Sequence, residues 1–293
     1  MIDGALLLDK PLGLSSNAAL QIAKRLLGAK KAGHAGTLDP LASGLLLLLC
    51  GEATKFAGPL LDADKEYVAL LKLGESTATG DAEGAVVARG PTDVAESKID
   101  SVLRAFTGTI EQIPPMYSAL KQAGVPLYDL ARRGETVERR PRQVRILQIS
   151  AIRFERPLLE LRVRCSKGTY IRTLAEDIGV KLGTVAHLAG LRRTASGGFR
   201  IEDAVTLDAL EAAQPEARRA RLLPLTALLT GLPRAELDAA SVARFRQGQA
   251  LAHPAQEGVC GVYGPDGCVI GLGRADAAGQ LHPMRLTAMQ DAE

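Results

Sequence analysis

The chain of 293 residues contains no tryptophan, and only 3% of its residues are aromatic. Its four cysteines form no C-x-x-C pair and combine with the four histidines in no metal-binding spacing, which disfavours structural zinc and a disulfide framework. No apolar run approaches the roughly 18 residues that a membrane span needs. We therefore expect a soluble protein that binds neither a metal ion nor a membrane.

Motifs for nucleotide cofactors and common hydrolases are also missing. The phosphate loop G-x-x-x-x-G-K-[ST] is absent, and "GLGRAD" at Gly271 lacks the third glycine of a dinucleotide fingerprint. Neither H-E-x-x-H nor G-x-S-x-G occurs, so zinc proteolysis and α/β-hydrolase chemistry are excluded. If the protein is an enzyme, we expect it to work without a cofactor.

The first residues lack the features of a signal peptide. Asp3 stands where a signal peptide carries basic residues, and the apolar segment Ala5–Leu8 is shorter than a signal peptide requires. We therefore expect a cytoplasmic protein.

Positive charge is concentrated in the first 230 residues, although the whole chain carries a net charge of only +3. Residues 231–293 hold five basic and seven acidic residues. Six arginines but only two acids lie between Arg132 and Arg145. Such a block suits a phosphate backbone, and a solvated charged loop explains it equally well.

The length favours two domains of unequal size. Strands and helices alternate over residues 1–230 without a regular βαβ rhythm, which predicts an α/β (α+β) domain with a mixed sheet. From Gly231 onward, short strand-like segments separated by turns predict a small, mostly-β domain over residues 231–293.

Apolar periodicity predicts the main elements of the larger domain. Ser15-Ser16 offers an N-cap for an amphipathic helix that ends at Gly28, and Leu45–Leu49 is expected to form a buried strand. Further strands are predicted over Ala5–Leu8, Glu66–Leu73 and Leu159–Cys165, and further helices over Val94–Phe106 and from Ile171.

The glycine-rich segment "GHAGTLDPLASG" (Gly33–Gly44) contains Asp39, followed by Pro40. Asp39 can cap a short turn with Pro40 at the first helical position, which is the commoner role of an Asp-Pro pair. The surrounding glycines permit close approach of backbone, which also suits a catalytic carboxylate. The residue pattern leaves both interpretations open.

Several motifs, taken in order, resemble the TruB family of tRNA pseudouridine synthases. In chain order they are "LLLDKPLGLSS", "KAGHAGTLDPLASGLLLLLCGEATKF", "DKEYVALLKLGESTATGDAEG", "IPPMYSALKQAGVPLYDLARRGE" and "SKGTYIRTLAEDIG". The resemblance covers most of Leu6–Arg193. It extends more weakly to the C-terminal part, which resembles a PUA-like RNA-binding domain.

The resemblance implies a pseudouridine synthase catalytic domain that isomerises uridine at position 55 in the T loop of tRNA. The N1–C1′ bond is broken and C5 is joined to C1′, without a cofactor. We expect a monomer whose partner is the T-arm stem-loop of tRNA. Two rival functions remain: a catalytically idle RNA-binding or tRNA-folding protein on the same scaffold, and a related synthase that acts on rRNA.

The same resemblance implies three catalytic residues. Asp39 is the catalytic aspartate, Arg172 pairs with it, and Tyr67 stacks on the flipped-out uracil and assists proton removal. Whether Asp39 attacks C1′, attacks the uracil ring or removes a proton from C2′ stays open.

Substrate-binding residues are implied in the same way. His34 holds the flipped-out nucleotides, although a turn histidine is the plain alternative, and Lys55, Tyr170 and Leu191 line the pocket, although a leucine there also suits a core. The arginine block coincides with an insertion at about residues 118–145 that closes over the RNA like a thumb. The implied RNA contacts in it are Arg132, Arg133, Arg139, Arg140 and Arg142.

Overall fold

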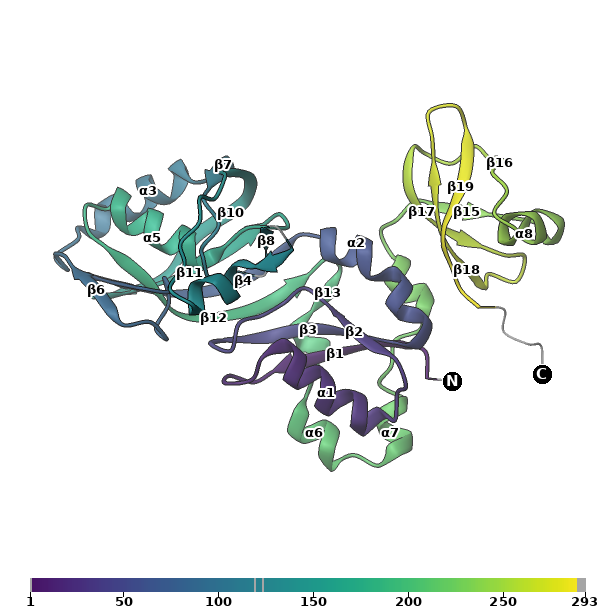
Figure 1. Cartoon of the computed structure of the whole chain (residues 1–293), viewed down its shortest axis with the longest axis horizontal. Coiled ribbons are helices and arrows are strands. Elements are labelled where there is room, and N and C mark those ends of the chain that lie inside the picture. The colour runs from purple at the N-terminus through teal and green to yellow at the C-terminus, as the bar shows by residue number, and fades with distance from the viewer. Residues whose placement is uncertain (1, 119, 123, 289–293) are drawn as a thin grey trace. The chain divides into compact units, whose positions relative to one another are not determined.

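The computed structural model describes residues 2–118, 120–122 and 124–288 (Figure 1). Its largest feature is a ten-stranded sheet with the strand order β14-β1-β3-β12-β4-β11-β10-β7, in which β2 also pairs with β3 and β13 with β12. These strands are β1 (Gly4–Lys10), β2 (Ala32–Ala35), β3 (Ala42–Cys50), β4 (Lys65–Leu73), β7 (Gly108–Gln112), β10 (Arg142–Glu155), β11 (Leu158–Cys165), β12 (Ala186–Ser196), β13 (Phe199–Arg200) and β14 (Val205–Thr206).

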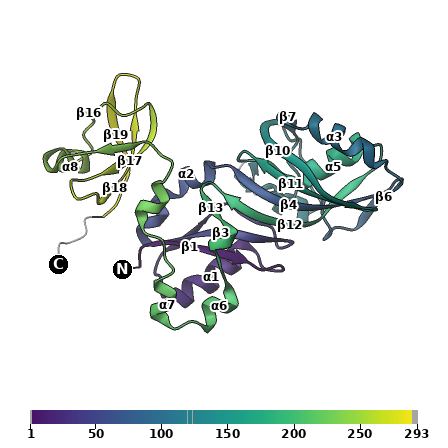
Figure 2. The same cartoon turned by 180° about the vertical axis from the view of Figure 1, so that it is seen from behind.

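The sheet is mixed, as predicted. Strand β3 pairs in parallel with β12, whereas β4 pairs antiparallel with both β12 and β11. The α-helices are α1 (Ser16–Leu27), α2 (Ala57–Asp62), α3 (Ile99–Ala105), α4 (Leu127–Arg132), α5 (Ile171–Lys181), α6 (Leu207–Ala212), α7 (Pro215–Arg219) and α8 (Ala239–Arg246). Helices α6 and α7 contact α1, as the rear view in Figure 2 shows. Among the described residues, every helix is too short or too polar to span a lipid bilayer.

A smaller sheet lies in the C-terminal part, with the strand order β15-β17-β18-β19-β16. Its strands are β15 (Arg234–Glu236), β16 (Leu251–Ala252), β17 (Gly258–Tyr263), β18 (Val269–Ala275) and β19 (Gln280–Leu286). Phe245 of α8 joins Val262 and Leu281 in a separate apolar core. The mostly-β character predicted after Gly231 is therefore confirmed.

The chain divides into two compact units, and β3 belongs to both. One unit contains Met1–Leu38, Leu45–Asp62 and Gly198–Glu293, and the other contains Asp39–Gly44 and Ala63–Gly197. This division follows spatial packing and does not coincide with the domain boundary expected at residue 231, which stays a prediction.

The core of the second unit lies between its strands and helices α3 and α5. Strand β11 alternates buried apolar residues with more exposed glutamate and arginine, as its sequence predicts. Leu161 of β11 packs in one cluster with Leu71 of β4 and Ile178 of α5. Burial of each such side chain stabilises the fold by about 1.5–3 kcal/mol.

Helix α1 and strand β3 form where the sequence predicts them. The Ser15 hydroxyl caps α1 by accepting a hydrogen bond from the Ala18 N–H, and Gly28 ends the helix in the left-handed conformation. Residues 45–49 of β3 are all buried, because Leu47 packs in one core cluster and Leu48, facing the opposite way, packs in another.

Two local predictions are wrong. Pro40 does not begin a helix: the Ala42 N–H donates to the Asp39 carbonyl over 3.0 Å, which closes a turn, and the chain enters β3 at once. Helix α3 begins at Ile99 and not at Val94. The Val94 carbonyl accepts hydrogen bonds of 3.1 and 2.8 Å from the Arg156 guanidinium, so this buried apolar residue belongs to a loop.

Candidate active site

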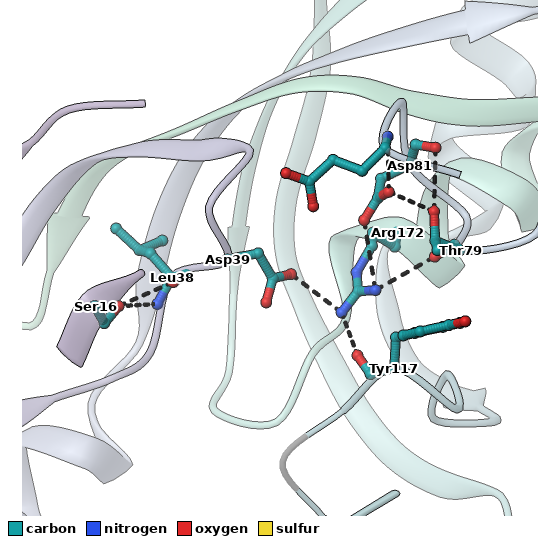
Figure 3. A network of polar contacts seen from close by, with 8 residues as sticks. Ser16, Leu38, Asp39, Thr79, Asp81, Tyr117 and Arg172 are labelled. Carbon is teal, nitrogen blue, oxygen red and sulfur yellow. Dashed lines mark hydrogen bonds and ion pairs between the residues drawn. The ribbon is translucent and has the colours of Figure 1, made fainter. Parts of the chain in front are cut away.

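Asp39 and Arg172 form the centre of the site (Figure 3). Arg172 lies in the first turn of α5, and its Nη2 is 3.1 Å from Oδ2 of Asp39. The Arg172 side chain is only 8% exposed, whereas that of Asp39 is 46% exposed. A buried cation therefore holds a carboxylate that a ligand can still approach.

The Arg172 guanidinium has three further acceptors. Its Nη2 donates to the Tyr117 carbonyl over 2.6 Å, and its Nη1 donates to the Thr79 carbonyl over 3.3 Å. Nη1 also lies 3.5 Å from Oδ2 of Asp81. Because the guanidinium is planar and bonded on several sides, its orientation toward Asp39 is fixed.

Asp81 is a site residue that the sequence interpretation missed, as is Arg193 beside Tyr67. The Asp81 side chain is 4% exposed, and its Oδ1 accepts hydrogen bonds from the Thr79 hydroxyl over 2.5 Å and from the Glu83 N–H over 3.1 Å. Two carboxylates, those of Asp39 and Asp81, thus contact one guanidinium. The available signal was the quoted motif "GDAEG", whose aspartate follows a polar turn.

Gly44 is the last residue of the glycine-rich segment that contains Asp39. It lies opposite Arg193 of β12 at a φ of +103°, and a Cβ there would stand 2.3 Å from the Arg193 carbonyl oxygen. No side chain fits this approach, so the two strands can pair here only through glycine. Gly44 thus serves a close approach between two protein strands.

Tyr67 lies in β4 directly opposite Arg193 of β12. Arg193 is 1% exposed, and its side chain hydrogen-bonds the Tyr67 phenol. Burial raises the pKa of Tyr67, the Arg193 charge opposes this effect, and the Asp39 charge adds to it. The Tyr67 phenol is therefore neutral at neutral pH.

Tyr170 occupies the N-cap position of α5, two residues before Arg172. Its backbone is held by the Gln112 side chain, which accepts from the Tyr170 N–H over 3.0 Å and donates to its carbonyl over 3.3 Å. Burial raises the pKa of the phenol, while the positive charges of Arg142 and Arg172 lower it. The Asp39 charge acts on Tyr170 as it does on Tyr67, which places both phenols within electrostatic reach of the carboxylate.

Leu191 was predicted to line the substrate pocket, and in the structure it packs against the core. Its backbone lies opposite Ala42 of β3 and Ala69 of β4, and its half-buried side chain packs against the core of the second unit. The contact of Leu191 with a substrate stays a prediction.

His34 and Lys55 belong to the first unit. His34 lies in β2 opposite Leu48 of β3. Lys55 lies in a 3₁₀ helix over Gly51–Phe56, where its Nζ is 2.8 Å from Oε2 of Glu52. The roles of both residues in RNA binding stay predictions.

The predicted thumb contains a short hairpin of β8 (Lys121–Gln122) and β9 (Val125–Pro126), followed by α4. The Arg132 guanidinium lies 5.5 Å from the centre of the Tyr128 ring. Four of its implied RNA contacts are exposed: Arg132, Arg133, Arg140 and Arg142.

Arg139 differs from these four arginines. Its side chain is half-buried and donates to the Pro114 carbonyl over 3.1 Å. This bond ties the segment after α4 to the chain before the hairpin, so Arg139 supports the base of the thumb.

Comparisons with known proteins give the site its context. The model of the TruB family pseudouridylate synthase N-terminal domain matches residues 24–171, and two models of the family's C-terminal regions match residues 172–230 and 233–287. The chain belongs to the TruB family of pseudouridylate synthases. The family predicted from the motifs, and with it the enzyme class, is therefore confirmed.

TruB-family relatives match over nearly their full length. "tRNA pseudouridine synthase B" of Aromatoleum aromaticum is 54% identical over 98% of this chain and 94% of its own, and that of Dechloromonas aromatica is 53% identical over 99% and 97%. A chain of a Cbf5-Nop10-Gar1 complex aligns over 98% of this chain and 84% of its own, with a TM-score of 0.75 and 29% identity. A chain of an H/ACA RNP bound to a substrate RNA containing 2′-deoxyuridine aligns over 98% and 86%, with a TM-score of 0.75 and 27% identity.

Among the described residues, no group of three or more His, Cys, Asp and Glu side chains is placed to hold a metal ion. The chemistry that the described site offers is that of a carboxylate oriented by arginine, with two neighbouring phenols.

Proposed function

We propose that this protein isomerises uridine to pseudouridine at position 55 in the T loop of tRNA. The observation that carries the proposal is the half-exposed Asp39 carboxylate held by the buried Arg172. Its relatives named tRNA pseudouridine synthase B, which match over almost the whole chain, support tRNA as the substrate.

The negative charge of Asp39 suits the cleavage of the N1–C1′ bond, which is the difficult step of the reaction. Cleavage of the N1–C1′ bond builds positive charge on the ribose and negative charge on the uracil. A fixed anion beside the ribose stabilises this separation of charge, and one oriented before the reaction costs little reorganisation. Asp39 supplies that anion, and its 46% exposure lets a ribose reach it.

Tyr67 fits the second requirement, which is to hold a base outside the stacked loop. Extrusion of a nucleotide costs a few kcal/mol, and stacking on an aromatic side chain returns about 1–3 kcal/mol. A neutral phenol beside Arg193 can stack on uracil, and its hydroxyl can take part in proton transfer during the rearrangement.

The exposed arginines of the thumb supply phosphate contacts to the T arm, which position the RNA without reading its sequence. Under the same proposal, residues 231–293 form a PUA-like domain that contacts the RNA. The protein acts in the cytoplasm as a monomer.

The experiment uses a full-length, unmodified tRNA transcript treated with the protein, followed by carbodiimide labelling and primer extension, which stops at pseudouridine. We expect one new stop, at position 55, and none on a transcript with cytidine there. Modification of an rRNA fragment with no stop on tRNA would favour the rRNA synthase. Tight binding of tRNA with no stop would favour the idle RNA-binding protein.

A further inference from the structure

Ser16 is a buried polar residue that the mechanism above does not use. The Ser15-Ser16 pair suggests a helix cap, but only Ser15 caps α1. The Ser16 side chain does not cap the helix and instead points toward Leu38, the residue before Asp39 (Figure 3).

Both hydrogen-bonding functions of the Ser16 hydroxyl are engaged by one residue, Leu38. The hydroxyl accepts from the Leu38 N–H over 2.7 Å and donates to the Leu38 carbonyl over 2.9 Å. Ser16 is 2% exposed and Leu38 is 3% exposed. If the hydroxyl were removed, two buried backbone groups would lose their partner, and water has little access to replace it.

These two bonds act directly on the residue after Leu38. The Leu38 carbonyl and the Asp39 nitrogen belong to the same planar peptide group, so holding that carbonyl orients the peptide from which Asp39 departs. On the C-terminal side of Asp39, the hydrogen bond from the Ala42 N–H to the Asp39 carbonyl holds the backbone. The Asp39 side chain extends from this backbone to Arg172, so a shift of the backbone changes where the carboxylate lies relative to the guanidinium.

We propose that Ser16 is a positioning residue for the isomerisation: its hydroxyl clamps the Leu38 peptide and thereby sets the position of the Asp39 carboxylate against the ribose. This inference rests on the proposed function. Helix formation does not require a serine at this position, since alanine has the higher helix propensity and Ser15 already provides the cap.

The test compares Ser16→Ala with Ser15→Ala, which removes a hydroxyl from the adjacent residue without touching Leu38. Single-turnover rates are measured at saturating T-arm stem-loop, together with RNA affinity and thermal unfolding. We expect Ser16→Ala to slow the chemical step by about 10- to 100-fold, since a displacement near 1 Å can cost that much. Its RNA affinity should change less than threefold. Ser15→Ala should keep the wild-type rate within twofold.

Three results would overturn the inference: a Ser16→Ala rate within twofold of wild type, equal rate losses in both variants, or a loss of affinity in place of rate. Ser16→Thr keeps the hydroxyl and should restore most of the rate. If Ser16→Ala does not fold, a Ser16→Thr protein that folds and binds RNA but reacts as slowly as Asp39→Asn would count against the clamp.

Hydrogen exchange at the Leu38 amide provides a readout that needs no substrate. We expect slow exchange in wild type and Ser15→Ala, and exchange at least tenfold faster in Ser16→Ala. An inactive wild type with this exchange pattern would reject the proposed function and keep the clamp. Unchanged exchange in Ser16→Ala would reject the clamp whatever the activity.

Discussion

Asp81 and Asp39 approach the same guanidinium from different loops, and the two carboxylates differ in exposure. Asp81 is buried with hydrogen bonds to Thr79 and Glu83, whereas Asp39 is open to a ligand. The buried carboxylate therefore orients Arg172 and offsets part of its charge, which leaves the exposed carboxylate to act on the substrate.

Replacement of Asp81 by Asn should slow single turnover about 10- to 100-fold while RNA affinity stays near wild type. Asparagine can keep the Thr79 and Glu83 bonds through its oxygen, but its amide would then face the Arg172 guanidinium, donor against donor. The matched control is Glu83→Gln, whose side chain is exposed. Equal rates for Asp81→Asn and the control would contradict this role.

Asp39 and Arg172 were predictable because each stands in a motif that resembles the family's. The orienting role of Asp81 was not predicted, although Asp81 stands in one of the quoted motifs, "DKEYVALLKLGESTATGDAEG". Its sequence context shows a turn aspartate, and only the folded chain brings it within 3.5 Å of Arg172, which lies on a helix far along the sequence.

At the scale of elements, the pairing of β3 with β12 places Asp39, just before β3, beside Arg172 of α5. Gly44 lies at the tightest point of that pairing, where its missing side chain admits the Arg193 backbone. Gly33 lies in the same glycine-rich segment, but a Cβ added there would meet nothing within 4 Å.

Gly44→Ala should therefore lower the free energy of unfolding by roughly 2–4 kcal/mol, because it combines a strained φ with a backbone clash. Gly33→Ala should change it by less than about 0.5 kcal/mol. Denaturant unfolding of both variants measures the difference. Similar losses in the two would show that the β3–β12 approach is not the reason for the glycine.

The thumb arginines give a prediction about salt. Arg133→Ala and Arg140→Ala should each weaken T-arm binding and reduce the slope of log K against log salt by about 0.7–0.9 for each phosphate that the protein no longer neutralises. Arg153→Ala is the control, since that exposed arginine lies near Glu155 and Glu160. A slope unchanged in the thumb variants, or reduced equally in the control, would exclude phosphate binding by these arginines.

Periodicity predicted α1 and β11 well, because each of them buries one face. The unbroken apolar run Leu45–Leu49 predicted β3, which is buried on both faces. Periodicity failed at the start of α3, because Val94 is apolar and buried yet lies in a loop, where its carbonyl is bonded to Arg156. A bond to a residue so distant in sequence leaves no local pattern.

At the scale of the whole molecule, the mixed sheet was predictable from the irregular order of strands and helices. The division into compact units was not, because it passes through β3 and depends on which distant strand pairs with each end. Composition located the change to short strands near Gly231 but contains no information about that pairing.

The pH dependence of global stability offers a test of the fold around the site. Burial raises the pKa of Glu176, and the neighbouring Asp177 raises it further, while Arg172 opposes both. The folded state therefore holds this proton more tightly than the unfolded state. The resulting stabilisation is complete below the ordinary glutamate pKa of 4.5 and is lost as the pH rises through the raised pKa.

Glu176→Gln should accordingly unfold at a higher temperature than wild type at pH 7, and the difference should shrink toward pH 4. Glu257→Gln removes the same charge from an exposed position and serves as the control. Thermal unfolding followed by circular dichroism across this range measures the effect. A Glu176→Gln protein that is less stable than wild type at pH 7 would contradict a raised Glu176 pKa in the folded state.

The most direct test of the central claim is tritium release from a T-arm stem-loop labelled at C5 of the target uridine, measured for wild type and Asp39→Asn together with RNA binding by both. Asparagine keeps the size of the side chain and removes the anion. We predict release by wild type, a loss of about 10²- to 10³-fold in Asp39→Asn, as expected when a group that stabilises the transition state is removed, and similar RNA affinity for the two proteins. Release by Asp39→Asn at a rate near wild type would show that the carboxylate held by Arg172 is not the catalytic group.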